Sequence, residues 1–208
     1  MKKNQHYVWK YYLKAWADKN NRIACMIDGK PKVTNIDNLA CERYFYELTK
    51  PKFGDYDLMK IILDIDKYDS DKKAYFHLIF DTFTKVFQAQ KEYEMNGNLT
   101  PEADRKFIKV IRELDEEFNS IIEGMGKQFI MSFRGQSGLA LNLEQKATFY
   151  LFLCTQYMRT KRTREKIINT PDLDNEFRDF LGRTWSIVKH CFALNLAETL
   201  FLDRKSVV

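Results

Sequence analysis

The spacing of hydrophobic residues changes along this chain, from irregular near the N-terminus to helical over most of the remainder. From about residue 57 onward, apolar residues recur at three- and four-residue steps, the pattern of amphipathic helices. One predicted helix carries its apolar face over residues 76–87, and the next begins at Pro101. Together they predict an antiparallel helical hairpin over residues 71–123 that can project from the body. We expect glycines to loosen the chain after this hairpin: Gly124, Gly126, Gly135 and Gly138.

Residues 143–168 predict a further helix, and its section 149–154 is apolar on all sides. A helix of that kind is buried on most of its faces. We therefore expect it to be the central helix of the fold. A last helix is predicted from about Leu173 to Leu202.

The first 56 residues have a different pattern. Residues 5–17 fit a short helix better than a strand, and residues 22–27 and 32–34 predict two strands. Asp28-Gly29 between them is a strong signal for a β-hairpin. A two-stranded ribbon is marginally stable alone, so it must pack on helices.

These patterns predict a mainly α fold, a helical bundle around a buried central helix. We expect a single domain over residues 1–208. Residues 1–56 would form an N-terminal helix plus a small β-hairpin. Residues 57–208 would form the helical body.

Composition adds that the chain of 208 residues has 45% hydrophobic residues and a net charge of +5. This charge is common in ordinary soluble proteins, but it is unevenly spread. Residues 1–50 carry ten Lys and Arg against five Asp and Glu. Residues 159–166 carry five against one.

The chain shows no targeting or membrane signal. Met1-Lys2-Lys3 is not followed by the apolar stretch of a secretory signal peptide. The charge-free run from Ala147 to Met158 is too short to span a bilayer. We therefore expect a cytoplasmic protein without a membrane partner.

Candidate chemistry gathers where the apolar run of the predicted central helix stops. Gln156, Arg159 and Thr160 lie at helical three- and four-residue steps and share a face with Thr163. A guanidinium near a core needs carboxylate, phosphate or carbonyl partners. One interpretation is a structural pair or a solvated helix end, and the other is an anion site for a phosphate-bearing ligand.

His6 is the other candidate, because imidazole near neutral pH can act as acid, base or metal ligand. A lone histidine is more often a hydrogen-bonded structural residue, and His190 is expected to be a packing or surface residue. Three scattered histidines without carboxylate spacing predict no metal site. No nucleotide-binding or nucleophile motif indicates a cofactor or an enzyme class, so both stay unknown. The acidic run that starts at Asp115 is interpreted as a solvated helix face.

Two motifs resemble a large, mainly bacterial family, family four-two-three-eight of the domains of unknown function. The opening Gln5-His6-Tyr7-Val8 followed by Tyr12-Leu13 is similar to the family's first motif. The set Gln156, Arg159, Thr160 and Arg164 is similar to its second. Trp9 and Lys161 stand where the family has proline. Family members usually continue into a Thr-Ser-Asp-x-Pro segment, whereas this chain stops at a strand-like Ser206–Val208, so the resemblance implies a shortened member or a fragment. It implies intracellular bacterial proteins and no assigned activity or cofactor.

Two functional hypotheses follow. In the first, the protein is phosphate-directed, a nucleic-acid-binding or nuclease-like member of a defence system. His6 would act as acid or base, and Arg159, Arg162 and Arg164 would hold phosphate in one cleft. Four further residues would support them: Gln5, Tyr7, Gln156 and Thr160.

In the second hypothesis, the protein is a non-enzymatic helical interaction module. The N-terminal segment would dock on the central helix, where Gln156 and Arg159 satisfy its backbone carbonyls. Such a module would carry an apolar surface elsewhere, for example on the 71–123 hairpin, and could form a homodimer.

Overall fold

The fold is mainly α, as the sequence predicts, in a computed structural model that describes residues 3–134 and 141–203. Gly135, Gly138 and the strand-like end Ser206–Val208 lie outside the described residues. The strands are β1 (Asn4–His6), β2 (Arg22–Ile27), β3 (Lys30–Asn35) and β4 (Cys41–Arg43). The helices are α1 (Lys10–Lys14), α2 (Asp55–Leu63), α3 (Ser70–Met95), α4 (Pro101–Arg134), α5 (Leu143–Met158), α6 (Lys161–Ile168) and α7 (Asn175–Asp203), with 3-10 turns η1 (Ile36–Asn38) and η2 (Ile65–Lys67).

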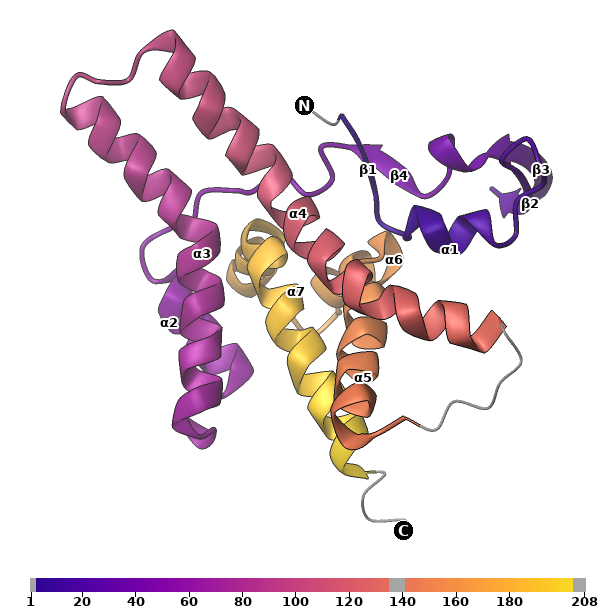
Figure 1. Ribbon diagram of the computed structural model, residues 1–208. Helices are drawn as coiled ribbons and strands as arrows, with labels where there is room; N and C mark the ends of the chain where they lie inside the picture. The colour runs from indigo at the N-terminus through magenta and orange to yellow at the C-terminus, as the bar shows by residue number, and fades with distance from the viewer. Residues whose placement is uncertain (1–2, 135–140, 204–208) are drawn as a thin grey trace.

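Helix α7 runs through the middle of the helical body, where α2, α3 and α5 pack against it (Figure 1). Its buried residues include Phe180, Val188 and Cys191. Asp55 on α2 accepts two hydrogen bonds from the Arg183 guanidinium of α7, at 3.0 and 2.7 Å. In the described part of the chain, no helix has both the length and the apolarity that crossing a membrane requires.

The prediction that one central helix spans residues 143–168 is wrong in two respects. The helix ends at Met158, and α6 begins after Thr160, whose side-chain oxygen accepts a hydrogen bond from the Thr163 backbone N–H. Such an N-cap starts a new helix by satisfying an otherwise unpaired donor. Helix α7 is also more fully buried than α5, on which Leu153 is 40% exposed.

Helices α3 and α4 form the expected antiparallel pair, and its far end extends away from the body (Figure 1). The expected loosening of the chain at Gly124 and Gly126 is wrong, because α4 continues through both glycines to Arg134. Glycine in a helix interior costs only about 1 kcal/mol relative to alanine, so packing can outweigh its low propensity. Gly126 is buried where α4 crosses α5, and the ring of Phe152 occupies the space where a Cβ would lie.

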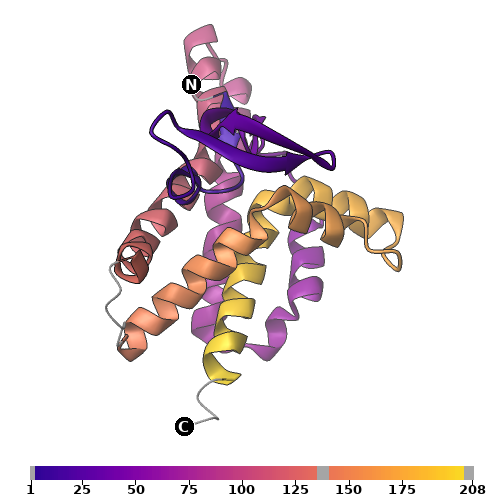
Figure 2. The same ribbon diagram turned by 90° about the vertical axis from the view of Figure 1, so that its right-hand side faces the viewer.

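The N-terminal segment (residues 3–48) lies across one end of the helical body (Figure 2). The β-hairpin of strands β2 and β3 is confirmed, with its turn at Asp28 and Gly29, which both have positive φ. The predicted helix over residues 5–17 is wrong at its start, since α1 begins only at Lys10. Residues 4–6 instead pair antiparallel with β4, with Gln5 opposite Glu42. A partner more than thirty residues away is invisible to local periodicity.

The close approach of α4 and α5 gives a first prediction. Gly126→Ala places a methyl group 2.1 Å from a Phe152 ring carbon, so the ring or the helices must move. Overpacking of this kind destabilises a core by roughly 1–3 kcal/mol. Gly124→Ala on the same helix meets nothing within 4 Å and should stabilise the protein by up to about 1 kcal/mol. Urea unfolding of both variants measures the difference; equal stabilities would contradict the packing described.

Candidate functional site

Gln5 fastens strand β1 into the core. Its side chain is fully buried, and its Oε1 accepts a 2.7 Å hydrogen bond from the backbone N–H of Tyr46. Its Nε2 donates at 2.5 Å to the backbone carbonyl of Arg112 on α4. One amide therefore joins β1, the chain after β4 and helix α4. Both ends of the amide are satisfied, as burial requires.

Arg159 follows the last residue of α5 and is 3% exposed. Each of its three side-chain nitrogens has a protein partner. Nε donates to the Tyr46 hydroxyl at 2.8 Å, and Nη2 donates to the His6 backbone carbonyl at 2.6 Å. Nη1 forms an ion pair with Glu123 of α4. The guanidinium thus joins α4, α5 and the N-terminal segment at one buried point.

Tyr46 completes this arrangement, since its hydroxyl donates to the His6 carbonyl at 3.0 Å. Burial raises the pKa of Tyr46 well above its usual range, although the Arg159 charge opposes the shift. The phenol therefore stays neutral and keeps the proton that this hydrogen bond needs. The His6 carbonyl consequently accepts two hydrogen bonds, one from Tyr46 and one from Arg159.

A second buried polar cluster lies against the Tyr46 ring. The Lys189 ammonium of α7 is 4.4 Å from the ring centroid and donates to Asp115 of α4 at 2.5 Å. His190 Nε2 lies 3.0 Å from the other Asp115 oxygen, and the Asn119 amide donates to that same oxygen at 3.0 Å. The expected solvated face at Asp115 is wrong, because this residue is fully buried.

Charge sets the protonation states in this cluster. Burial alone would raise the pKa of Asp115, but Lys189 and His190 outweigh it and lower the pKa to about 2. Burial lowers the pKa of Lys189 to about 8, against the attraction of Asp115. Burial likewise lowers the pKa of His190, so its ring is neutral at pH 7. The cluster carries one negative and one positive charge at that pH.

The structure brings His6 and Arg159 together through the His6 backbone and not through its ring. The half-buried imidazole points to the N-terminal segment itself, with Nε2 3.1 Å from the Ile36 carbonyl oxygen. Of the supporting residues, Gln5 is buried and Thr160 caps α6. The Nε2 atom of half-buried Gln156 is buried without a hydrogen-bond partner in the part of the chain that is described.

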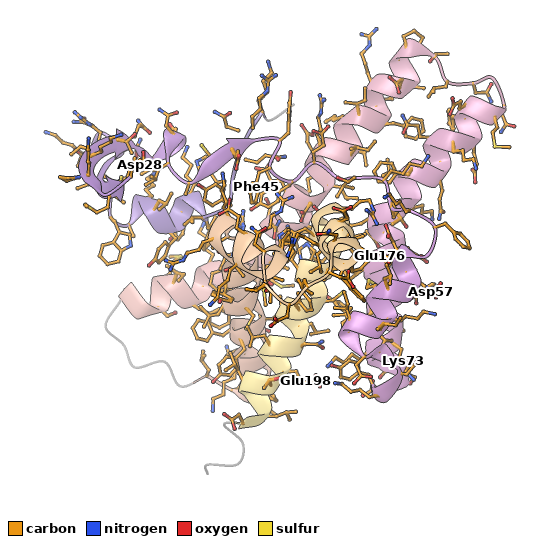
Figure 3. All side chains as sticks on the ribbon, turned by 180° about the vertical axis from the view of Figure 1, so that it is seen from behind. Asp28, Phe45, Asp57, Lys73, Glu176 and Glu198 are labelled. Carbon is orange, nitrogen blue, oxygen red and sulfur yellow. The ribbon has the colours of Figure 1, made fainter. Side chains whose placement is uncertain are left out.

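Arg162 and Arg164 differ from Arg159. Both lie in the first turn of α6; Arg162 is exposed and Arg164 is half-buried. The Arg164 guanidinium lies 5.7 Å from the ring centroid of Phe45, which packs on the ring of Tyr7 at 5.1 Å. Neither guanidinium pairs with a carboxylate within residues 3–134 and 141–203. Figure 3 labels Phe45 where the N-terminal segment meets the helical body.

The surface formed by the first turn of α6 and the adjoining rings is called here the arginine face, defined by Tyr7, Phe45, Lys161, Arg162 and Arg164. Lys161 is paired with Glu42 at 3.2 Å, so the two arginines supply its unneutralised charge. Burial raises the pKa of Tyr7, which therefore presents a neutral ring.

Two cavities of the described chain lie away from these residues. One of about 530 Å³ lies between α3, α5 and α7, and one of about 480 Å³ lies beside α2 and the chain that joins α6 to α7. Neither is lined by His6 or Arg159. No group of three His, Cys, Asp or Glu side chains suited to a metal ion occurs among the residues described.

Sequence reasoning missed the residues that hold this region together. Glu123, Asp115 and Lys189 were not candidates, although Lys189-His190 interrupts a strongly apolar stretch of α7. Two polar residues at inward positions of a buried helix are the signal that could have found them.

A family model described as "Protein of unknown function (DUF4238)" matches residues 4–187. The chain therefore belongs to this family, in agreement with the resemblance of its two motifs. No curated protein and no solved structure matches the chain.

The buried guanidinium gives a second prediction. Arg159→Met removes the ion pair between Arg159 and Glu123 and leaves the His6 carbonyl with one donor fewer. Breaking a buried ion pair from one side costs roughly 3–5 kcal/mol. Arg162→Met, on the exposed side of α6, should change stability by no more than about 0.5 kcal/mol. Urea unfolding measures both stability changes. Amide hydrogen exchange in β1 and β4 should accelerate only in the Arg159 variant. Protection equal to wild type in that variant would contradict the role assigned to Arg159.

Asp115 gives a third prediction, on pH. Because its folded pKa of about 2 lies below the ordinary value of 3.8, its contribution is present above pH 3.8 and is lost as the pH falls toward 2. The shift corresponds to about 2 kcal/mol. His190 adds a loss below its ordinary value of 6.5, since protons bind the unfolded chain more readily.

Unfolding free energies measured from neutral to acid pH test this. Asp115→Asn should be less stable than wild type at pH 7, by roughly 3–5 kcal/mol, because Lys189 loses its counter-ion. The difference should shrink below pH 4. Glu117→Gln, on the exposed face of the same helix, should follow the wild-type profile. A difference that stays constant with pH would exclude the assigned ion pair.

Proposed function

We propose that this DUF4238 protein is phosphate-directed and binds nucleic acid through the arginine face. The observation that carries the proposal is the contrast between its arginines. Arg159 is buried with all three nitrogens engaged, whereas Arg162 and Arg164 have no carboxylate partner among the described residues. A cation left unpaired at the surface is available to an external anion.

The chemistry of the arginine face suits a phosphate backbone. Guanidinium groups bind phosphate through two parallel hydrogen bonds. The N-terminus of α6, where both arginines lie, adds partial positive charge. The ring of Phe45, which packs on Tyr7, lies beside Arg164, and neighbouring aromatic and basic side chains are typical of nucleic-acid surfaces. The charge excess of residues 1–50 extends the same sign over the N-terminal segment.

In this proposal, Arg159 is a positioning residue. It holds the His6 carbonyl and Tyr46 against α4 and α5, and Tyr46 directly follows Phe45. Thr160, the residue after Arg159, caps α6, and the two arginines of the arginine face follow this cap. We assign the His6 ring a structural role, which its contact with the Ile36 carbonyl supports, and propose binding without a catalytic step.

A second candidate is the non-enzymatic interaction module. The hydrogen bond from Arg159 to the His6 carbonyl is the contact that this hypothesis expects. The β-hairpin also leaves Met26 67% exposed and Val33 58% exposed. A homodimer formed through this hairpin would appear as twice the chain mass in sedimentation, and Met26→Lys would return it to a monomer; a monomer at high concentration would contradict it.

The proposed function gives a fourth prediction. Arg162→Ala/Arg164→Ala should weaken binding of a fluorescently labelled oligonucleotide about tenfold or more, because charge-assisted hydrogen bonds contribute roughly 1.5–3 kcal/mol each. The dependence of log K on log salt should become shallower by about one unit for each phosphate group that the variant no longer neutralises. Fluorescence anisotropy over a salt series measures both quantities.

Lys73→Ala on α3 removes a cation at a distance from the arginine face and is the control (Figure 3). It should bind like wild type. If the arginine double variant also binds like wild type, or if wild type binds no oligonucleotide, the proposed function is wrong.

A further inference from the structure

Helix α1 and the turn that follows it present two aromatic rings to solvent, those of Tyr12 and Trp16. Trp16 is 68% exposed and Tyr12 is 46% exposed, and their centroids lie 6.5 Å apart in an edge-to-face arrangement. The other aromatics of the opening segment are packed: Trp9 lies against Phe152 at 5.7 Å, and Tyr7 lies against Phe45. The exposure of Tyr12 and Trp16 is therefore not explained by anchoring the segment to the body.

The surroundings of these rings are positively charged. Lys14 and Lys19 are exposed and form no ion pair within the described chain. Lys127 of α4 lies 5.6 Å from the ring centroid of the adjacent Tyr11. The acid nearest in sequence is Asp18, whose Oδ1 accepts hydrogen bonds from the backbone N–H groups of Asn20 and Arg22, and the two lysines outnumber it. The charge of this surface favours an anionic partner.

The exposed rings of Tyr12 and Trp16 are close in sequence to the arginine face. Tyr7 belongs to the arginine face, and Tyr12 is five residues further on. Five residues span at most roughly 18 Å even when fully extended. Stacked nucleotides rise about 3.4 Å each, so a strand of about five nucleotides can reach from one surface to the other.

We infer that Tyr12 and Trp16 form a stacking ledge for the bases of single-stranded nucleic acid, with Lys14 and Lys19 beside its backbone. The inference rests on the proposed function and names its substrate class. A duplex hides the faces of its bases, whereas unstacked bases stack on aromatic side chains, with a contribution of roughly 1–3 kcal/mol per base. The arginine face contacts phosphate in either form. The ledge adds affinity for single strands alone.

The chain offers a matched control for the ledge. Tyr93, near the end of α3, is 47% exposed, almost the same fraction as Tyr12. Its neighbours in sequence are Glu92 and Glu94, so its surroundings are acidic where those of Tyr12 are basic. Replacing Tyr93 therefore removes an equally exposed ring whose acidic neighbours disfavour binding of a polyanion.

The test compares a labelled oligothymidine with a labelled duplex of the same length by anisotropy. Trp16→Ala and Tyr12→Ala should each weaken oligothymidine binding about tenfold and leave duplex binding within about twofold of wild type. Tyr93→Ala should bind both probes like wild type. Thermal melting confirms that each exposed-site variant is folded.

Other results would overturn the ledge. If Trp16→Ala binds oligothymidine like wild type while Arg162→Ala/Arg164→Ala loses both probes, the ledge is wrong and the proposed function stands. If wild type binds neither probe, both fail. Trp16-dependent binding to phosphatidylserine vesicles, or a Trp16-dependent dimer in sedimentation, with oligothymidine binding unaffected, assigns the rings to a membrane or to a second copy.

Discussion

The burial of one guanidinium constrains much of this structure. A charged side chain inside a protein is stable only when partners replace its lost water. Arg159 finds three partners on two parts of the chain: Tyr46 and the His6 carbonyl in the N-terminal segment, and Glu123 on α4. Because these partners come from the N-terminal segment and from α4, their need to meet at the end of α5 orients the segment on the helical body. The arginine face owes its shape to this requirement.

The second cluster shows how the interior remains electrically balanced. Arg159 is matched by Glu123, and Lys189 is matched by Asp115, and both cations lie close to the neutral Tyr46 ring. The two buried cations are thereby neutralised inside the fold. The cations proposed to bind lie outside it, on the first turn of α6 and around α1. Binding is therefore proposed at the surface, and the buried network is assigned to architecture.

Local pattern was sufficient for some elements and insufficient for others. The β2–β3 hairpin follows from Asp28-Gly29 between apolar runs, and α3 follows from its periodic apolar face, because both depend on neighbours in sequence. Strand β1 depends on β4 more than thirty residues away. Helix α4 includes Gly126 because α5 packs so closely on it that the Phe152 ring leaves no room for a Cβ. Local sequence contains no sign of this contact. Asp115 looked like a surface acid because its partner Lys189 lies 74 positions further along.

The sequence by itself determined the mainly α class, the β-hairpin and the family motifs. It also placed the candidate residues in two short stretches, residues 5–7 and residues 156–164. Tertiary structure alone decided which of those residues are internal. Arg159, Arg162 and Arg164 carry the same group within six residues, and local sequence treats them alike. They differ in burial because α5 ends before Thr160 and α6 begins after it. Arg159 therefore lies in the core, whereas Arg162 is exposed to water. Whether an arginine is buried or hydrated depends on which distant segments of the chain pack around it, and the local sequence pattern does not contain that information.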